Sequence, residues 1–239
     1  MIASHQPTIF GTEVIAAMSS VKNGTMKFGS GQDEMVLQNR TAFLREAGIA
    51  IADTTLVSIT YATDDFAKYR VVGTKDKGRG MQPGDAFEPA DALVVDRPNH
   101  ALFLPLADCV GVILYDATHH ALMVSHVGRH SAEIEGAIKS VQYLQSCYNT
   151  DPRELKVWLS PGVGNATYPL HAFNGRSLHD VITTQLLDVG VQGYSIENGN
   201  IDTAGSEQYY SHSEFLKGNK QSGRFAIVAM MREQGEPAS

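Results

Sequence analysis

The stretch that decides the fold runs from Ala90 to Ser131 and reads ADALVVDRPNHALFLPLADCVGVILYDATHHALMVSHVGRHS. It holds four apolar runs, at 92–95, 101–106, 110–115 and 121–124, separated by turn-type residues. Runs this short and continuous are typical of buried strands rather than helices. Cys109 lies in the break before the third run, and His126 follows the fourth. The pattern therefore predicts neighbouring buried strands with a thiol and an imidazole at their ends.

Outward from this stretch, the pattern predicts one α/β domain over residues 1–239, a single domain of mixed β-sheet layers flanked by helices. Amphipathic spacing predicts helices at 32–48, 132–147 and 176–187, the second with Ser131 as its N-cap. Runs of β-branched and apolar residues predict further strands at 13–18, 54–61, 69–72, 155–159, 191–196 and 225–230. Residues 73–84 are expected to form an exposed glycine-rich connection, and residues 205–223 a long polar loop.

Composition excludes several classes of function. A formal charge of −7 argues against nucleic acid as the main partner, because phosphate backbones require clustered Lys and Arg. No apolar run is long enough to cross a membrane, and the first 20 residues lack the pattern of a signal peptide. The two cysteines, Cys109 and Cys147, make no disulfide framework, which favours a reduced, cytoplasmic protein. We expect a small-molecule substrate and a monomer or weak homo-oligomer.

Cys109 and His126 are the first candidates for chemistry. A buried structural role is the alternative for Cys109, because free cysteine is among the most buried residue types. His126 precedes a glycine and a helix start, where backbone N–H groups can hold an anion. The pair could serve as soft ligands for zinc, or as nucleophile and base, although a zinc site normally needs three protein ligands. His130 follows four residues later, whereas the other histidines are interpreted as surface or satisfied core residues.

Three motifs of the central stretch resemble signatures of the multicopper polyphenol oxidase or laccase-domain family, which includes the peptidoglycan editing factor. ADALV at 90–94, ADC at 107–109 and HVGRHS at 126–131 are similar to the family's ADALVT, ADC and HAGWRG. Weaker similarities follow in order, at Asn39-Arg40, at Ser160–Gly164 with Tyr168, and at Tyr210-Ser211 with Gly223-Arg224. The resemblance covers about residues 30–230 and implies a laccase-domain α/β fold.

The resemblance also implies a zinc or copper site formed by two histidines and one cysteine. Carried over by position, the cysteine ligand is Cys109 and the second histidine is His126. The family's first histidine aligns with Tyr61, and the late cysteine of the family aligns with Asp202. Tyr61 would be a poor zinc ligand, because a phenol with a reference pKa near 10 must ionise first. Arg129-His130 stands where the family has Trp-Arg, which adds a cation beside the site.

Three hypotheses follow from this pattern. In the first, a metal, zinc or less favourably copper, is held by Cys109 and His126 with His130, His212 or Tyr61. The chain would then be a hydrolase or transferase for phosphorolysis or deamination of a purine nucleoside, or for a related molecule such as a muramyl-peptide precursor. In the second, Cys109 acts without metal as a thiolate activated by His126. In the third, the chain is a ligand-binding relative that has lost catalysis.

The substrate contacts are predicted separately from the reaction. Arg40, Tyr61, Arg129 and Arg224 are the candidate substrate-binding residues, and arginines with a helix start could hold the phosphate of a nucleoside or sugar phosphate. Copper oxidase chemistry is the least favoured activity, because one Cys-His pair cannot supply several copper sites.

Overall fold

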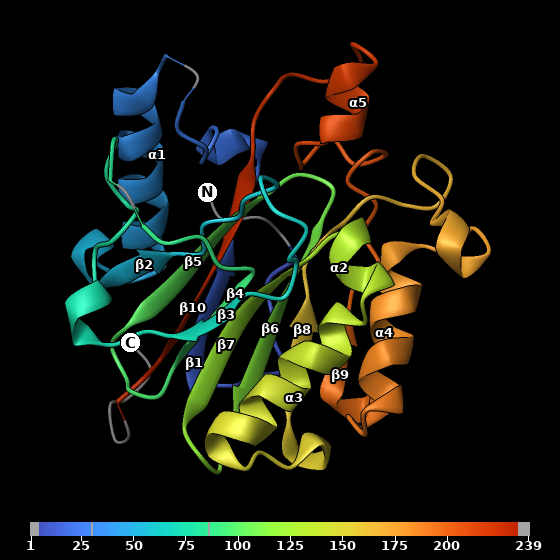
Figure 1. The fold of residues 1–239 in the computed structure, drawn as a ribbon. Helices are drawn as coiled ribbons and strands as arrows, with labels where there is room; N and C mark the ends of the chain where they lie inside the picture. Colours follow the sequence, from blue (N-terminus) through green and yellow to red (C-terminus); the bar gives the residue numbers. More distant parts are fainter. Residues whose placement is uncertain (1–4, 30, 86, 234–239) are drawn as a thin grey trace.

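Two mixed β-sheets form the centre of the molecule in a computed structural model, which describes residues 5–29, 31–85 and 87–233 (Figure 1). The four-stranded sheet has the order β1 (Val14–Met18), β10 (Phe225–Met231), β5 (Ala101–Leu106), β2 (Thr54–Leu56). The six-stranded sheet has the order β3 (Tyr69–Val71), β4 (Ala92–Val95), β7 (Ala121–Val127), β6 (Val110–Asp116), β8 (Lys156–Leu159), β9 (Ile196–Asn198).

All four strands predicted in the central stretch are confirmed. Three of them, β4, β7 and β6, lie side by side in the six-stranded sheet, whereas β5 belongs to the other sheet. The continuous apolar runs arise because both faces of each sheet are buried. Leu93 packs between the two sheets, for example, and its neighbour Val94 packs toward the helices on the outer face.

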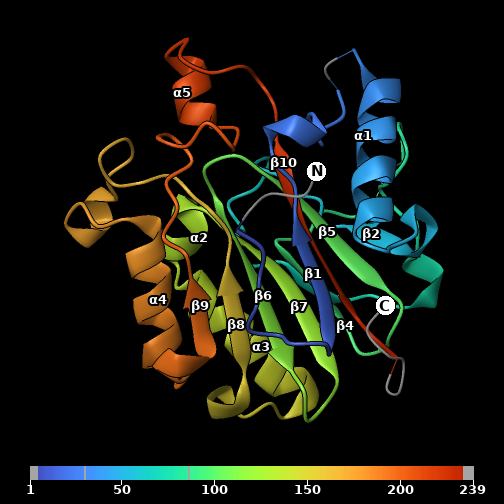
Figure 2. The same cartoon turned by 180° about the vertical axis from the view of Figure 1, so that it is seen from behind.

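Helices cover the outer face of each sheet, so the layers run helix, sheet, sheet, helix (Figures 1 and 2). The five α-helices of the described residues are α1 (Asp33–Glu46), α2 (Arg129–Glu133), α3 (Gly136–Tyr148), α4 (Leu178–Asp188) and α5 (His212–Leu216). Phe43 and Leu44 of α1 pack on Phe103 of the four-stranded sheet. Val141 of α3 and Ile182 of α4 pack on the six-stranded sheet. No helix among the described residues is long and apolar enough to span a bilayer.

Several predicted boundaries are wrong. The helix predicted over 132–147 is divided at Glu135, whose left-handed backbone (φ 62°) separates α2 from α3 and places the predicted cap Ser131 inside α2. The polar loop at 205–223 contains α5, and the exposed connection at 73–84 contains a short 3₁₀ helix, Thr74–Asp76, and the buried Met81.

Two predicted strands also differ from the structure, because pairing with a neighbour decides where a strand ends. The strand expected over 54–61 stops at Leu56, and Val57 donates one more hydrogen bond to Phe103 before the chain leaves the sheet. The strand expected over 191–196 begins only at Ile196, where β9 pairs with β8. Residues 57–68 instead become one wall of a cavity.

Candidate functional site

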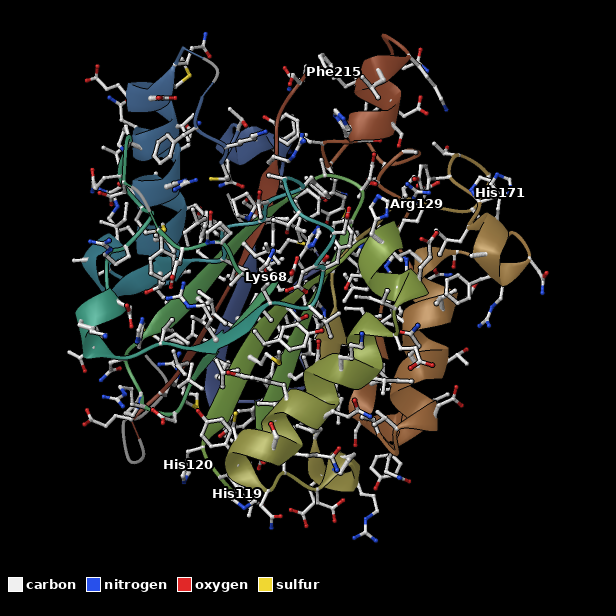
Figure 3. The ribbon with its side chains drawn as sticks, in the orientation of Figure 1. Lys68, His119, His120, Arg129, His171 and Phe215 are labelled. Carbon is white, nitrogen blue, oxygen red and sulfur yellow. The ribbon has the colours of Figure 1, made fainter. Side chains whose placement is uncertain are left out.

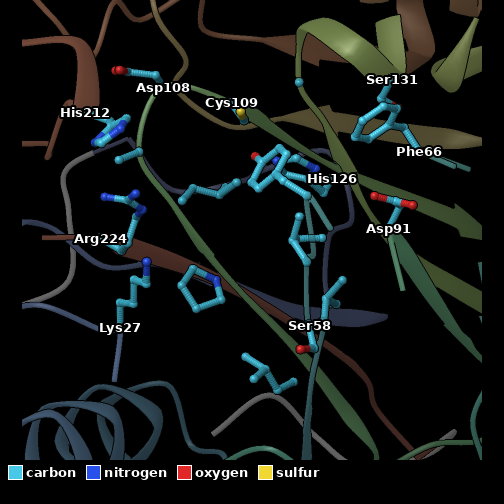
Figure 4. A pocket seen from close by; sticks show the side chains of 18 of the residues that line it. Lys27, Ser58, Phe66, Asp91, Asp108, Cys109, His126, Ser131, His212 and Arg224 are labelled. Atoms are coloured by element: carbon cyan, nitrogen blue, oxygen red, sulfur yellow. The ribbon is translucent and has the colours of Figure 1, made fainter. Parts of the chain in front are cut away.

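A cavity of about 630 Å³ lies beside the ends of β5, β6 and β7. The residues predicted from the sequence as ligands or substrate contacts all line it, namely Arg40, Tyr61, Cys109, His126, Arg129, His130 and Arg224. Figure 4 shows Cys109 and His126 in the middle of the wall, with Arg224, Lys27 and His212 on one side and Asp91 and Phe66 on the other. His212, the other candidate third ligand, also lines the cavity, whereas Figure 3 shows His119 and His120 at the bottom of the molecule, far from Arg129.

The antiparallel register of β6 and β7 brings Cys109 close to His126. Gly111 lies opposite His126, so the residue before β6 reaches the end of β7. Gly128 lies between the two side chains. A Cβ atom there would be 2.9 Å from Cys109 Sγ and 3.4 Å from His126 Cε1, so only a residue without a side chain leaves this approach open.

Asp108 fixes the turn that presents Cys109. Its backbone is left-handed (φ 84°), an uncommon conformation for a residue with a side chain. Its carboxylate accepts hydrogen bonds from Thr203 Oγ1 at 2.8 Å and from the Ser213 N–H at 2.6 Å, and its carbonyl accepts one from the Val163 N–H at 2.8 Å. One acidic residue thus ties three distant segments to the cavity wall.

The protonation states of Cys109 and His126 make them a neutral pair. Burial raises the pKa of the Cys109 thiol to about 11, although its hydrogen bond with Tyr61 and the charge of Arg224 act in the opposite direction. Burial lowers the pKa of His126 to about 4. His126 Nδ1 is buried and has no hydrogen-bond partner among the described residues. A thiol facing a neutral imidazole is not the thiolate–imidazolium pair that thiol catalysis needs.

Tyr61 stands where the resemblance predicts the first histidine. Its ring meets the His126 ring edge-on at 6.5 Å between centroids, and it shares a hydrogen bond with Cys109. The residue is 65% exposed, yet burial of its hydroxyl group, together with the neighbouring Cys109, raises the pKa of the phenol. Tyr61 therefore contacts both Cys109 and His126 as a neutral hydrogen-bonding group.

The residues around this pair do not fit a three-ligand zinc site. Within the described residues, no three His, Cys, Asp or Glu side chains lie close enough to hold one ion. His130 stacks on Phe66 with 4.7 Å between ring centroids and makes a 3.1 Å hydrogen bond with Arg129. His212 stacks on Phe215 at 6.2 Å. Neither His130 nor His212 thus completes a metal site with Cys109 and His126, and the phenol of Tyr61 is the remaining candidate for the third ligand.

The three arginines differ in how much hydrogen-bonding capacity they have left. Arg40 is 2% exposed and donates to the carbonyls of Met26 and Gly80 at 2.9 and 3.0 Å, so most of its capacity is used within the protein. Arg129 lies 3.9 Å from Glu133 at the rim. Arg224 donates from Nη1 to the Gly223 carbonyl at 2.7 Å, and its other guanidinium N–H groups have no protein acceptor among the described residues.

Asp91 is a site residue that the sequence did not single out. It lines the cavity, is 4% exposed, and accepts a hydrogen bond at Oδ2 from the Lys68 N–H at 3.0 Å. Its carbonyl accepts the His126 N–H at 2.8 Å, which joins it to the centre of the site. Burial raises the pKa of the Asp91 carboxyl. The signal was present, since Asp91 belongs to the ADALV motif at 90–94.

Two packed mixed sheets, with a cysteine and a histidine on one cavity wall, define an α/β domain with a candidate small-molecule site. The family model for multi-copper polyphenol oxidoreductase laccase matches residues 17–175, well over half of the chain. The chain therefore belongs to this family, as its motifs predicted.

Curated relatives and solved structures agree with this assignment. The chain is 20% identical to a purine nucleoside phosphorylase of Bacteroides thetaiotaomicron over 64% of this chain and 65% of the relative. It is 26% identical to a purine nucleoside phosphorylase of Mycobacterium tuberculosis over 61% of this chain and 64% of the relative. The match thus spans less than two thirds of either relative.

The solved structures show the fold alone. YlmD of Geobacillus stearothermophilus superposes with a TM-score of 0.83 at 17% identity, over 98% of both chains. Bacillus licheniformis YfiH superposes with a TM-score of 0.79 at 20% identity, over 92% of this chain and 93% of that one. The predicted laccase-domain α/β fold is confirmed.

Proposed function

We propose that the cavity binds a purine nucleoside or a chemically related small molecule. The observation that carries this proposal is the convergence of Cys109, His126 and Asp91 on one cavity of about 630 Å³, a size typical of small-molecule sites. The names of the curated relatives, purine nucleoside phosphorylases, supply the ligand class.

The walls suit a planar base with polar edges. Phe66, stacked on His130, and the exposed ring of Tyr61 offer aromatic surface to a purine. The neutral imidazole of His126 can donate from one ring nitrogen and accept at the other. The Asp91 carboxylate can accept from an amine or hydroxyl group of the ligand. We infer that these groups orient the base, while the thiol of Cys109 remains protonated beside it.

Binding is the part of the family's function that this site supports best. A metal-dependent phosphorolysis or deamination would need a third ligand, and the phenol of Tyr61 has its pKa raised rather than lowered. A thiolate mechanism would need Cys109 ionised, and its pKa is raised too. We therefore propose nucleoside binding with turnover well below that of a relative that has the full set of two histidines and one cysteine.

A second candidate function is a nucleoside phosphorylase or deaminase that keeps a metal on an altered ligand set. One observation favours it: Nδ1 of His126 is buried without a hydrogen-bond partner among the described residues, beside Cys109 Sγ. An unpaired buried nitrogen costs about 1–3 kcal/mol, and a bound cation would remove that cost.

Calorimetric titration of chelator-treated protein with adenosine and inosine tests the first proposal. We expect saturable binding of at least one of them, with cytidine weaker because its ring offers less surface for stacking. Product analysis by chromatography, with and without inorganic phosphate, measures turnover in the same samples. Failure of both purine nucleosides to bind at millimolar concentration would overturn the proposal.

Substitution of Tyr61→His separates the two candidates. We expect metal analysis to find far less than one zinc per chain in the wild-type protein, and close to one in Tyr61→His, because a neutral imidazole needs no ionisation to bind zinc. Tyr194→His, at a tyrosine that is 85% exposed, is the matched control and should take up no extra zinc. A wild-type protein that already carries stoichiometric zinc, lost in Cys109→Ser, would favour the second candidate.

A further inference from the structure

Two cations at one side of the cavity have no anionic partner among the described residues. Arg224 is half-buried, Lys27 is exposed at the rim, and both line the cavity. Within the part of the chain that the structure describes, no ion pair involves either residue. The guanidinium N–H groups of Arg224 that do not donate to the Gly223 carbonyl are therefore available to a ligand.

Backbone hydrogen bonds hold these two residues next to each other. The Met26 N–H donates to the Arg224 carbonyl at 2.9 Å, and the Arg224 N–H donates to Thr25 Oγ1 at 3.1 Å. Lys27 follows directly on this paired segment. Figure 4 shows the two side chains together on one side of the cavity, with His212 nearby. Their proximity is thus fixed by the fold and does not depend on a ligand.

A buried carboxyl group lies on the opposite side of the cavity. Asp91 lies there, beyond His126 and Cys109 when viewed from Arg224 (Figure 4). An anionic group of a ligand is repelled from the Asp91 carboxylate and attracted to Arg224. The pair of cations on one side and Asp91 on the other therefore favour a ligand whose anionic end lies toward Arg224 and Lys27.

We propose that Arg224 and Lys27 form an anion subsite that holds a phosphate group beside the thiol of Cys109. Arginine presents parallel N–H donors that match phosphate oxygens, and lysine adds a point charge. The phosphate is either carried by the ligand, as in a nucleoside 5′-monophosphate, or bound as inorganic phosphate beside a nucleoside. The nucleoside part of this inference rests on the proposed function, whereas the phosphate subsite can be tested by itself.

Calorimetric titration with inorganic phosphate, AMP and adenosine, each on the full chain, tests the subsite. We expect phosphate or AMP to bind the wild-type protein, and Arg224→Met to weaken that binding about tenfold or more, the usual effect of losing a hydrogen bond to a charged group. Lys27→Met should weaken it by a smaller factor. Lys75→Met, at an exposed lysine outside the cavity, is the matched control and should bind like the wild type.

Arg224→Lys keeps the test valid if the methionine variant does not fold, because it retains the charge and loses the paired donors. It should bind phosphate with intermediate affinity. Tighter binding of AMP than of adenosine, abolished in Arg224→Met, assigns the phosphate to the ligand. Independent binding of phosphate and adenosine, with AMP no tighter than adenosine, assigns it to inorganic phosphate. Either result supports the subsite.

The subsite is refuted if the wild-type protein binds neither phosphate nor AMP more tightly than Arg224→Met does. Adenosine binding in that case leaves the proposed function intact. Conversely, phosphate binding that depends on Arg224, without binding of adenosine, inosine or AMP, supports the subsite and contradicts the nucleoside proposal. The two inferences therefore fail in distinguishable ways.

Discussion

The reactivity of Cys109 tests the neutral state of the site. Burial raises the pKa of its thiol from 9.0 to about 11. At a pH below both values, two pKa units reduce the thiolate fraction about 100-fold. The more basic thiolate is intrinsically more nucleophilic, which recovers about tenfold of that loss. We therefore expect Cys109 to react about tenfold more slowly than an ordinary thiol, and more slowly still because the reagent must enter the cavity.

The second cysteine supplies the internal reference, because Cys147 is exposed. Chelator-treated protein would be mixed with excess disulfide reagent between pH 6 and 9, using the wild type, Cys109→Ser and Cys147→Ser. We expect one fast phase that disappears in Cys147→Ser and one slow phase that disappears in Cys109→Ser. Both thiols should react at one rate after denaturation.

A different outcome would refute the reasoning. The Cys147→Ser variant reports Cys109 alone, and Cys109→Ser reports Cys147 alone. If Cys109 reacted as fast as Cys147 at pH 7, and its rate stayed constant between pH 7 and 6, Cys109 would be an activated thiolate. The hypothesis of a metal-free thiol enzyme would then replace the binding proposal, because His126 would have to be protonated to stabilise that thiolate.

Two further perturbations follow from the geometry. Burial lowers the pKa of His126 and His100 from 6.5 to about 4, so the stability that their neutral forms contribute is complete above pH 6.5 and is lost as the pH falls toward 4. For each histidine, lowering the pH from 7 to 5 should reduce the free energy of unfolding by about 2 kcal/mol. Urea unfolding at the two pH values should therefore show a smaller drop in His100→Gln than in the wild type, and an equal drop would contradict this. Gly128→Ala should cost about 1–3 kcal/mol by forcing Cys109 and His126 apart, and should weaken nucleoside binding in calorimetry. Gly73→Ala, where a Cβ meets no atom within 4 Å, is the control, and a Gly128→Ala variant as stable as this control would argue against the close approach.

The sequence predicted the strands of the central stretch because each is buried on both faces. A run such as 110–115 has no polar position that a helix could turn toward water, so the strand assignment needed no knowledge of its neighbours. The helix over 132–147 looked equally regular, yet the chain breaks at Glu135. Its left-handed conformation allows α3 to pack beside α4, and such tertiary contacts leave no periodic signal.

The candidate site was predicted in part for a similar reason. The motifs placed Cys109 and His126 at the ends of adjacent strands, and the antiparallel register brings them together. Arg40 was predicted to bind substrate, and this stays a prediction: the residue lines the cavity, and its guanidinium donates to two backbone carbonyls. Asp91 and Lys27 could not be predicted as site residues, because their proposed contacts with a ligand depend on which side of the cavity they line. That arrangement exists only in three dimensions.

Several energetic costs converge on this cavity. Asp108 holds a left-handed backbone conformation, which costs about 1–3 kcal/mol for a residue with a side chain. Gly128 has no side chain, and a Cβ atom at this position would meet Cys109. Nδ1 of His126 is buried without a hydrogen-bond partner among the described residues. None of these features adds apolar packing to the core clusters between and outside the sheets.

A left-handed non-glycine residue and an unpaired buried nitrogen that lie in the wall of one cavity are typical of a functional site. A site that served only packing could remove each cost with one substitution, such as a hydrophobic residue in place of His126. The geometry around Cys109 and His126 therefore argues for a ligand that compensates these costs. Tyr61 limits what that ligand can undergo, because it supplies a neutral hydroxyl group where the family's metal site needs an imidazole. Retained geometry with an altered third position is the reason why we propose binding rather than turnover.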